Sequence, residues 1–348
     1  MIIGENEKIK LIRSKSYNYN FDKNTGYFAR WGETQDDNPV FAPAPEILDL
    51  EITDICEGIN GKVCPFCYKS NLPTNKKNMT FETFKIIFDK MIKSKLLTQI
   101  AFGVDSHCTS NPDVWKIMEY TRSNGVIPNV TVAQIDDDTA DKLVKYCGAV
   151  AVSVYDDKDA AYDSIKKLTD RGMKQINIHR MIAKETYVKT IEVIDDIKSD
   201  PRLAKLNAIV FLSLKQKGRG IHFNKVDDMQ FLGLIKHAME NKINFGFDSC
   251  TAPKFVKTAK ILGIYDKVEK MIEPCESSLF SSYINVDGEF FPCSFTEGVE
   301  GWKKGIDVVN CEDFIKDVWN NEKVKAFREH LIKDLDCNQC RHCPVFDV

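Results

Sequence analysis

Short apolar runs alternate with amphipathic segments through most of the chain, from about residue 46 to about residue 250. Apolar runs of this length predict buried strands, whereas apolar positions that recur every three to four residues predict helices. The predicted strands are 46–52, 97–102, 128–133, 149–154, 175–179, 208–212 and 244–247. The predicted helices are 80–95, 112–123, 137–146, 160–171, 187–198 and 227–241.

This alternation predicts parallel strands joined by right-handed helical connections. About seven strands are one too few for a closed eight-stranded barrel. The chain therefore divides into an N-terminal appendage at residues 1–45, an α/β unit at residues 46–250 and a cysteine-rich C-terminal segment at residues 251–348.

The appendage is predicted to contain a β-hairpin. Aromatic-rich stretches at 17–21 and 27–31 flank a turn-forming stretch at 22–26, which is a typical hairpin signal. Three prolines between residues 38 and 45 indicate a linker. We expect an edge ribbon that packs its aromatic side chains on the main unit; the alternative is a surface for a peptide or a partner.

The composition favours a globular protein and argues against nucleic-acid-binding, membrane and secreted proteins. The chain has 348 residues, of which 43% are hydrophobic and 28% charged, as is typical of a globular protein. The formal net charge of −3 gives no basic field for nucleic acid. No apolar run is long enough to cross a membrane, and the first residues lack the apolar region of a signal peptide. We therefore expect a cytoplasmic protein without nucleic-acid or membrane partners.

Cysteine is unusually frequent, with twelve residues in the chain. In a reducing compartment such cysteines indicate metal ligands rather than disulfides. Six of them form two tight groups, which are Cys56, Cys64 and Cys67 and then Cys337, Cys340 and Cys343.

The first group has the spacing C-x7-C-x2-C. Three thiolates this close in sequence can bind three irons of a [4Fe–4S] cluster and leave the fourth iron open. An open iron can bind a cofactor or substrate, as an open zinc position can. The alternative is a zinc knuckle with three cysteines and a missing fourth ligand.

The position of this loop resembles that in the radical SAM superfamily, in which a three-cysteine loop follows the first strand of the barrel. Here the loop follows the strand at 46–52, and Phe66 stands at the aromatic position before the last cysteine. The seven-residue first gap departs from the usual three. The resemblance implies an α/β fold with a partial (β/α)6 TIM-like barrel of parallel strands and one more strand near its end.

The resemblance also implies roles for these residues. Cys56, Cys64 and Cys67 would hold the cluster, whose open iron would chelate S-adenosylmethionine (SAM). Phe66 and Tyr68 would shield that site.

The ends of the predicted strands carry further candidates, because ligands gather at the carboxyl ends of parallel strands. Gly103 and Asp105 follow the second strand and resemble a Gly-Gly-Glu segment whose acidic residue binds the SAM ammonium; Val104 departs from the second glycine. The alternative for Asp105 is a turn or helix-capping aspartate. Thr131 and Ser153 resemble positions that contact the SAM methionine or ribose, but they could equally be caps.

The ends of the sixth and fifth predicted strands carry further candidate residues. Leu214 opens a segment, 214–220, that resembles one near the SAM adenine, although its basic residues could simply be solvated. His179 and Arg180 end the fifth strand, where a histidine is more often a hydrogen-bonded core residue than a functional group.

The C-terminal segment holds a second set of thiols. Cys275, Gly288 and Cys293 follow Cys-x12-Gly-x4-Cys around a predicted hairpin turn at 285–289, and a Cys-x2-Cys-x2-Cys run closes the chain. Two ligands from each part would saturate one iron–sulfur cluster; the alternative is a four-cysteine zinc site. The segment resembles a small SPASM/twitch domain with one auxiliary [4Fe–4S] cluster. The favoured ligands are Cys275, Cys293, Cys340 and Cys343, and Cys337 could displace one of them.

Together the two resemblances imply an enzyme that cleaves SAM reductively to a 5′-deoxyadenosyl radical and abstracts a hydrogen atom from its substrate. A peptide or protein is the expected substrate, modified by thioether or C–C crosslinking or by epimerisation. A flavodoxin- or ferredoxin-type protein is the expected electron donor. A radical SAM dehydrogenase or modifier of a small molecule is the alternative enzyme, and a non-catalytic Fe–S or zinc scaffold is the alternative of another class.

Cys250 belongs to neither group of cysteines and lies just past the last predicted barrel strand. It has three interpretations. It could be a buried thiol that acts as a small hydrophobe, an extra ligand of the auxiliary cluster, or a hydrogen donor to a substrate radical. The last is a tentative catalytic role.

Overall fold

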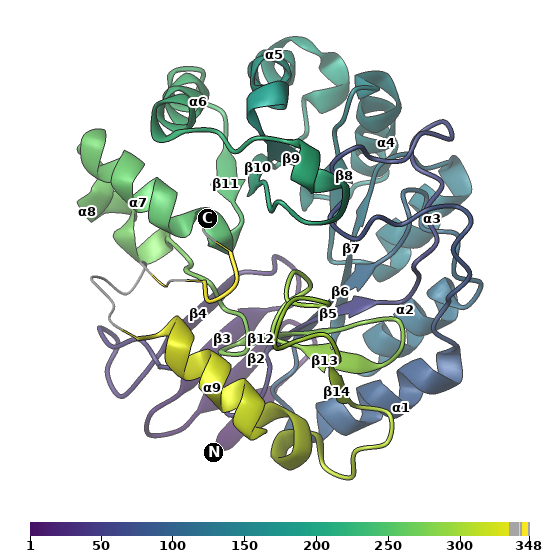
Figure 1. Cartoon of the computed structure of the whole chain (residues 1–348), viewed down its shortest axis with the longest axis vertical. Coiled ribbons are helices and arrows are strands. Elements are labelled where there is room, and N and C mark those ends of the chain that lie inside the picture. Colours follow the sequence, from purple (N-terminus) through teal and green to yellow (C-terminus); the bar gives the residue numbers. More distant parts are fainter. Residues whose placement is uncertain (334–340, 342, 347–348) are drawn as a thin grey trace.

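The computed structural model describes residues 1–333, 341 and 343–346. Its main feature is a curved ten-stranded sheet with the order β11-β10-β9-β8-β7-β6-β5-β12-β13-β14 (Figure 1). The strands from β5 to β11 pair in parallel in chain order, and β12 adds in parallel on the other side of β5. The predicted partial barrel is thus confirmed, with β11 as the extra strand.

The predicted barrel elements all form, with ends that differ from the prediction by no more than four residues. The parallel strands are β5 (Ile47–Glu51), β6 (Gln99–Gly103), β7 (Ile127–Val132), β8 (Ala149–Ser153), β9 (Ile176–Ile182), β10 (Ala208–Ser213) and β11 (Phe245–Phe247). The helices that connect them on the outer side of the sheet are α1 (Phe81–Met91), α2 (Val114–Ser123), α3 (Asp137–Tyr146), α4 (Lys158–Asp170), α5 (Tyr187–Ser199) and α6 (Asp228–Glu240) (Figure 1).

The two faces of the barrel sheet differ in chemistry. Side chains that point outward are apolar and buried under the helices; in β5 these are Leu48 and Leu50, both no more than 1% exposed. Asp49 lies between them on the inner face and is exposed. Because successive side chains of a strand alternate between faces, the core lies outside the barrel sheet. The inner face is left for the site.

The N-terminal appendage is a four-stranded antiparallel sheet rather than a single hairpin. The predicted hairpin is confirmed as β3 (Asn18–Asp22) and β4 (Phe28–Trp31), and the unpredicted strands β1 (Ile2–Glu5) and β2 (Ile9–Arg13) extend it. Tyr17 and Tyr19 are buried and contact the main unit, where the Tyr17 hydroxyl donates to Glu46 at 2.6 Å. The interpretation of an edge ribbon packed through its aromatic side chains is therefore confirmed.

The C-terminal segment continues the same sheet. The predicted hairpin is formed by β12 (Ser281–Ile284) and β13 (Glu289–Phe291), and β14 (Ile306–Asp307) pairs with β13. This segment also contains the helices α7 (Ala252–Ile261), α8 (Tyr265–Val268) and α9 (Glu322–Leu331) and a π-helical turn at Phe314–Trp319. Pairing of β12 with β5 places this hairpin directly beside the strand that leads into the first cysteine loop.

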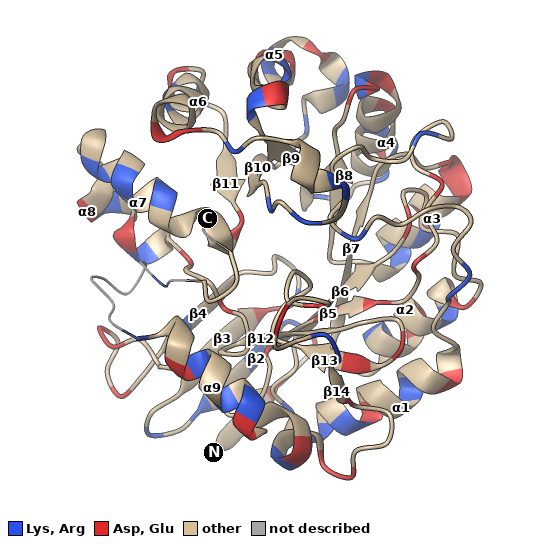
Figure 2. Ribbon diagram, in the orientation of Figure 1, with Lys and Arg blue, Asp and Glu red and all other residues tan. Residues whose placement is uncertain are grey.

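Charged residues cover the outer helices. Figure 2 shows basic and acidic residues interspersed along these helices rather than separated by sign, in line with the net charge of −3. Within the described residues, none of the helices combines the length and the apolar character that a membrane crossing needs.

Candidate active site

The first cysteine loop lies at the carboxyl end of β5. Cys56, Cys64 and Cys67 are half-buried free thiols. Burial raises the pKa of Tyr155, which follows β8, and the charges of all three thiols add to the rise. All three thiols therefore lie near Tyr155. Burial also raises the pKa of the Cys64 thiol to about 12, against a hydrogen bond from the Phe66 backbone.

Arg219 holds the cysteine loop from the segment that follows β10. Its side chain donates to the carbonyl of Cys64 at 2.9 Å and to that of Asn71 at 3.2 Å, and its backbone N–H donates to the carbonyl of Cys67 at 3.1 Å. Gly218 makes this approach possible, because a Cβ atom there would lie 2.4 Å from the carbonyl oxygen of Tyr68. The alternative that the basic residues of segment 214–220 are simply solvated does not hold for Arg219, which contacts the cysteine loop.

Phe66 and Leu214 belong to one small apolar cluster beside the loop. Phe66 meets Tyr155 and Phe223 edge to face, with ring centroids 5.1 and 5.8 Å apart. Leu214 is only 3% exposed. Tyr68 points the other way and packs on Phe295 of the C-terminal segment, with centroids 4.4 Å apart.

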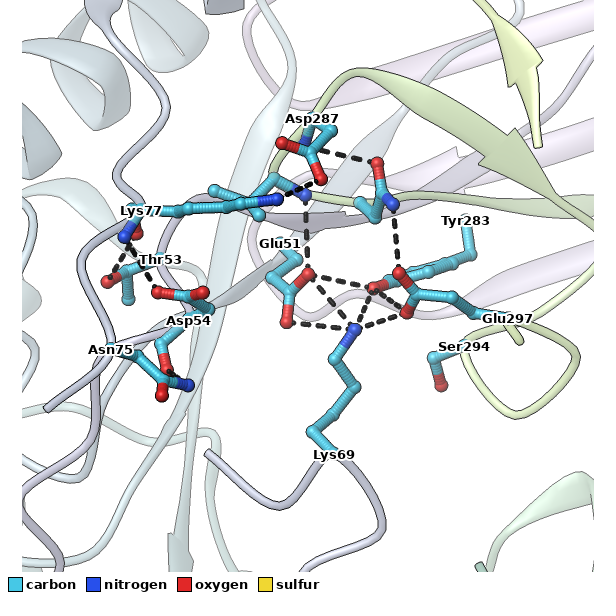
Figure 3. Close-up of polar contacts among 12 residues, drawn as sticks. Glu51, Thr53, Asp54, Lys69, Asn75, Lys77, Tyr283, Asp287, Ser294 and Glu297 are labelled. Carbon is cyan, nitrogen blue, oxygen red and sulfur yellow. Dashed lines mark hydrogen bonds and ion pairs between the residues drawn. The ribbon is translucent and has the colours of Figure 1, made fainter. Parts of the chain in front are cut away.

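Lys69 joins the cysteine loop to the C-terminal segment (Figure 3). Its ammonium group pairs with Glu51 at the end of β5 and with Glu297, and it donates to the Tyr283 hydroxyl at 2.9 Å. The Tyr283 hydroxyl in turn contacts both carboxylates. Burial lowers the pKa of Lys69, but the two carboxylates more than offset this, and the net shift is upward. The two parts of the chain are therefore linked through a charged cluster with little exposure to solvent.

Lys217 adds a second link between the same segments. It donates to the backbone carbonyls of Ser294, Phe295 and Glu297, just after Cys293. Neither Lys69 nor Lys217 was expected from the sequence. Lysines are mostly exposed in proteins, and no pattern in the sequence distinguishes Lys69 and Lys217 from solvated lysines.

The candidates at the ends of the strands differ in their exposure to solvent. Gly103 and Thr131 are exposed on the inner face of the barrel, and the Thr131 hydroxyl lies 3.5 Å from the ring nitrogen Nδ1 of His179. Ser153 is buried, and its hydrogen bond to Tyr155 lowers the pKa of that tyrosine, against the rise from burial. Burial lowers the pKa of His179 to about 4, while Asp248 opposes this. The histidine is thus neutral at ordinary pH.

Asp105 has the geometry of the turn aspartate that the sequence left as its alternative. It is buried, and its carboxylate accepts backbone N–H groups from His107 at 3.1 Å, Thr109 at 2.8 Å and Ser110 at 3.0 Å. These bonds order the loop that follows β6. Binding of the SAM ammonium group by Asp105 stays a prediction. Ordering of the loop after β6 is the alternative role of this carboxylate.

We expect the substitution Asp105→Asn to destabilise the protein by about 1–3 kcal/mol, because the amide group replaces a charged acceptor of backbone N–H groups. Chemical denaturation measures this change. A SAM titration of the same variant separates the two roles. Unchanged stability together with weakened SAM binding would show that Asp105 serves the ligand instead of the loop.

The second group of thiols gathers where the C-terminal segment meets the barrel. Burial raises the pKa of the Cys293 thiol to about 11, and the charges of Cys275 and Cys343 add to the rise. Burial likewise raises the pKa of Cys250, and Cys275 and Cys293 are among the charges that add to it. Cys275 and Cys293 therefore lie near both Cys250 and Cys343. Cys340, like Cys337, is outside the described residues, so its place in the ligand set stays a prediction.

The donor chemistry of both groups fits iron–sulfur clusters, whose usual ligands are thiolates. The loop supplies three thiols, which fits a cluster with one open iron, and the second group supplies at least three. Within the part of the chain that the structure describes, no three His, Cys, Asp or Glu side chains are close enough together to hold a single metal ion.

Comparison with known families bears on the second group. Residues 275–344 match the family model of SPASM, an iron–sulfur cluster-binding domain. This segment is similar to SPASM domains. The match begins at Cys275 and includes Cys293 and Cys343, so the expected auxiliary iron–sulfur domain is confirmed. The hairpin of β12 and β13 and helix α9 are parts of this SPASM domain.

Solved structures were compared as well. One similar structure is BtrN in complex with AdoMet and 2-DOIA, with 13% identity, 82% of this chain and 87% of that chain covered, and a TM-score of 0.44. Another is coproporphyrinogen III oxidase (HemN) from Escherichia coli, a radical SAM enzyme, with 12% identity and a TM-score of 0.39. The match covers 57% of this chain and 52% of that chain. No curated protein matches the chain in sequence.

Proposed function

We propose that this protein is a radical SAM enzyme with a SPASM domain. The observation that carries the proposal is the C-x7-C-x2-C loop at the carboxyl end of the first barrel strand, packed against a domain that matches SPASM. Ligands of parallel α/β sheets bind at this end of the strands.

The residues of the chain have distinct roles in this proposal. Cys56, Cys64 and Cys67 would hold the [4Fe–4S] cluster that, with SAM, supplies the hydrogen-abstracting 5′-deoxyadenosyl radical. Arg219 keeps the cysteine loop in place through the carbonyls of Cys64 and Asn71. The protein otherwise positions the substrate and excludes water.

A peptide or protein remains the substrate predicted from the sequence, and a flavodoxin- or ferredoxin-type protein the predicted electron donor. A small molecule is the second candidate substrate. The inner face of the barrel favours it, since polar and small side chains line that face and a buried network of Lys69, Glu51 and Glu297 closes the side next to the SPASM domain.

The proposed function is tested on protein purified and reconstituted without oxygen. Iron and sulfide in equal amounts, followed by formation of 5′-deoxyadenosine from SAM and dithionite, are the expected results. Bound zinc without iron would instead support the scaffold.

We propose that Cys250 is an extra ligand of the auxiliary cluster, beside the predicted set of Cys275, Cys293, Cys340 and Cys343. It lies in the short helical turn Ser249–Thr251 after β11, near Cys275 and Cys293, and it contacts the ammonium group of Lys215, which is paired with Asp248. The hydrogen-donor role from the sequence stays a prediction.

We expect Cys250→Ala to lower the iron content of the reconstituted protein and to alter the spectrum of the auxiliary cluster, because that cluster would lose a thiolate. Iron analysis and electron paramagnetic resonance measure this. Full iron content combined with a product that no longer takes up solvent hydrogen would instead identify Cys250 as the donor. A drop in stability of about 1 kcal/mol alone would mark a packing residue.

A further inference from the structure

The inner face of the barrel sheet is polar, unlike the branched aliphatic filling that is usual for closed barrels. The strand register puts Asp49 of β5 beside Ala101 of β6, and Ala101 beside Asn129 of β7. Farther along the sheet, Ala151 of β8 lies beside Asn177 of β9. Small alanines alternate with polar side chains, so the inner face leaves space and offers hydrogen bonds.

The amides at the amino-terminal end of the barrel are already paired. The Asn129 amide donates to Gln99 at 3.0 Å, and Asn207 donates to Asn177 at 2.9 Å. The hydrogen bonds of these amide groups are therefore made within the protein and leave little for a ligand. A ligand in the barrel would therefore find its partners among the other inner-face side chains, such as Asp49, Thr131 and His179.

Asp49 differs from its neighbours because its carboxyl group has no partner. No hydrogen bond or ion pair joins it to any residue that the structure describes. It is exposed to solvent, yet burial raises its pKa to about 7 and the charge of Glu276 adds to the rise. The carboxyl group is thus accessible on the inner face of the sheet, while the surrounding protein disfavours its charged form.

The other charges on the inner face are neutralised. Glu51 is paired with Lys69, and His179 is neutral at ordinary pH. Lys215, at the end of β10, is paired with Asp248. Among the described residues on the inner faces of β5 to β10, Asp49 is therefore the carboxyl group left to recognise a ligand.

We propose that Asp49 binds a protonated amine on a small polar substrate inside the barrel. An ammonium group would supply the hydrogen bonds and the opposite charge that the carboxylate lacks, and such charge-assisted bonds are strong where water is scarce. The neutral His179 and the hydroxyl of Thr131 leave the rest of the space free of positive charge. This inference rests on the proposed function, which takes the barrel interior as the substrate site.

The test compares binding of glucosamine with that of glucose, a neutral probe of the same size, to the reconstituted holoenzyme. We expect the wild type to bind glucosamine at least tenfold more tightly. Asp49→Asn, which keeps the shape of the side chain, should abolish this preference, whereas the exposed control Asp266→Asn should retain it. Thermal unfolding checks that both variants fold.

Equal affinity of the wild type for the two sugars, or a preference that persists in Asp49→Asn, would overturn the inference. Tighter binding of a blocked Gly-Lys-Gly peptide than of glucosamine would also overturn it, in favour of a peptide. A tenfold loss of SAM affinity in Asp49→Asn would assign the carboxyl to the SAM ammonium instead. Failure of the wild type to form 5′-deoxyadenosine with dithionite is a separate result, which counts against the proposed function.

Discussion

Replacing Cys56, Cys64 and Cys67 together by Ala is expected to abolish reductive cleavage of SAM while the iron of the SPASM domain stays in place. The three thiols lie on one loop after β5, whereas Cys275, Cys293 and Cys343 belong to the other group. Each [4Fe–4S] cluster has its own thiolate ligands. The variant should therefore retain about half of the iron and form no 5′-deoxyadenosine.

Iron analysis and chromatography of the SAM products measure the two effects. Cys311→Ala is the matched control, because its thiol is also partly exposed but donates only to the carbonyl of Val308. The control should keep both the iron and the activity. Continued formation of 5′-deoxyadenosine by the triple variant would refute the assignment of this loop, and loss of all iron would show that the two groups are not independent.

Replacing Lys69 by Met is expected to have the largest effect on stability. The ammonium group lies between Glu51 and Glu297, and the exposed fractions of the three side chains are 16%, 7% and 23%. Without it, two carboxylates that share the Tyr283 hydroxyl would repel each other with little water to screen them. Removal of one partner from a buried ion pair costs about 3–5 kcal/mol.

Denaturant unfolding of the reconstituted protein measures this cost. Lys85→Met is the control, because Lys85 forms an exposed pair with Asp89 on α1, and such pairs contribute below about 1 kcal/mol. The double variant Lys69→Met with Glu297→Gln should recover part of the loss, since the repulsion then disappears. A loss no larger than that of the control would mean that the cluster is freely hydrated and does not hold the two parts together.

The order of the barrel elements could be predicted from the sequence because each depends on local periodicity. Strands such as 149–154 are continuous apolar runs, and helices such as 137–146 have one apolar face, so the pattern of each segment identifies it without its neighbours. The cysteine groups are equally local, since their spacing within a short loop already limits the chemistry that they can support.

The first two strands show where this approach fails. In β2 the charged Lys10 is buried, where it donates to the carbonyl of Leu97, while the neighbouring Leu11 is 38% exposed. The polar and apolar positions are therefore reversed relative to the usual strand pattern. A partner 87 residues away decides which face is buried, and local periodicity contains no information about it.

The sequence by itself thus determined the alternating α/β order, the three-cysteine loop after the first barrel strand and the cysteine hairpin of the SPASM domain. Only the tertiary structure showed that Asp105 orders its own loop, that Cys250 lies near Cys275 and Cys293, and that Asp49 has no partner among the described residues on the inner face of the barrel. The physical reason is the same in each case. The partners of these side chains, or the absence of one, depend on segments far apart in the chain that meet only when the sheet curves and β12 pairs with β5.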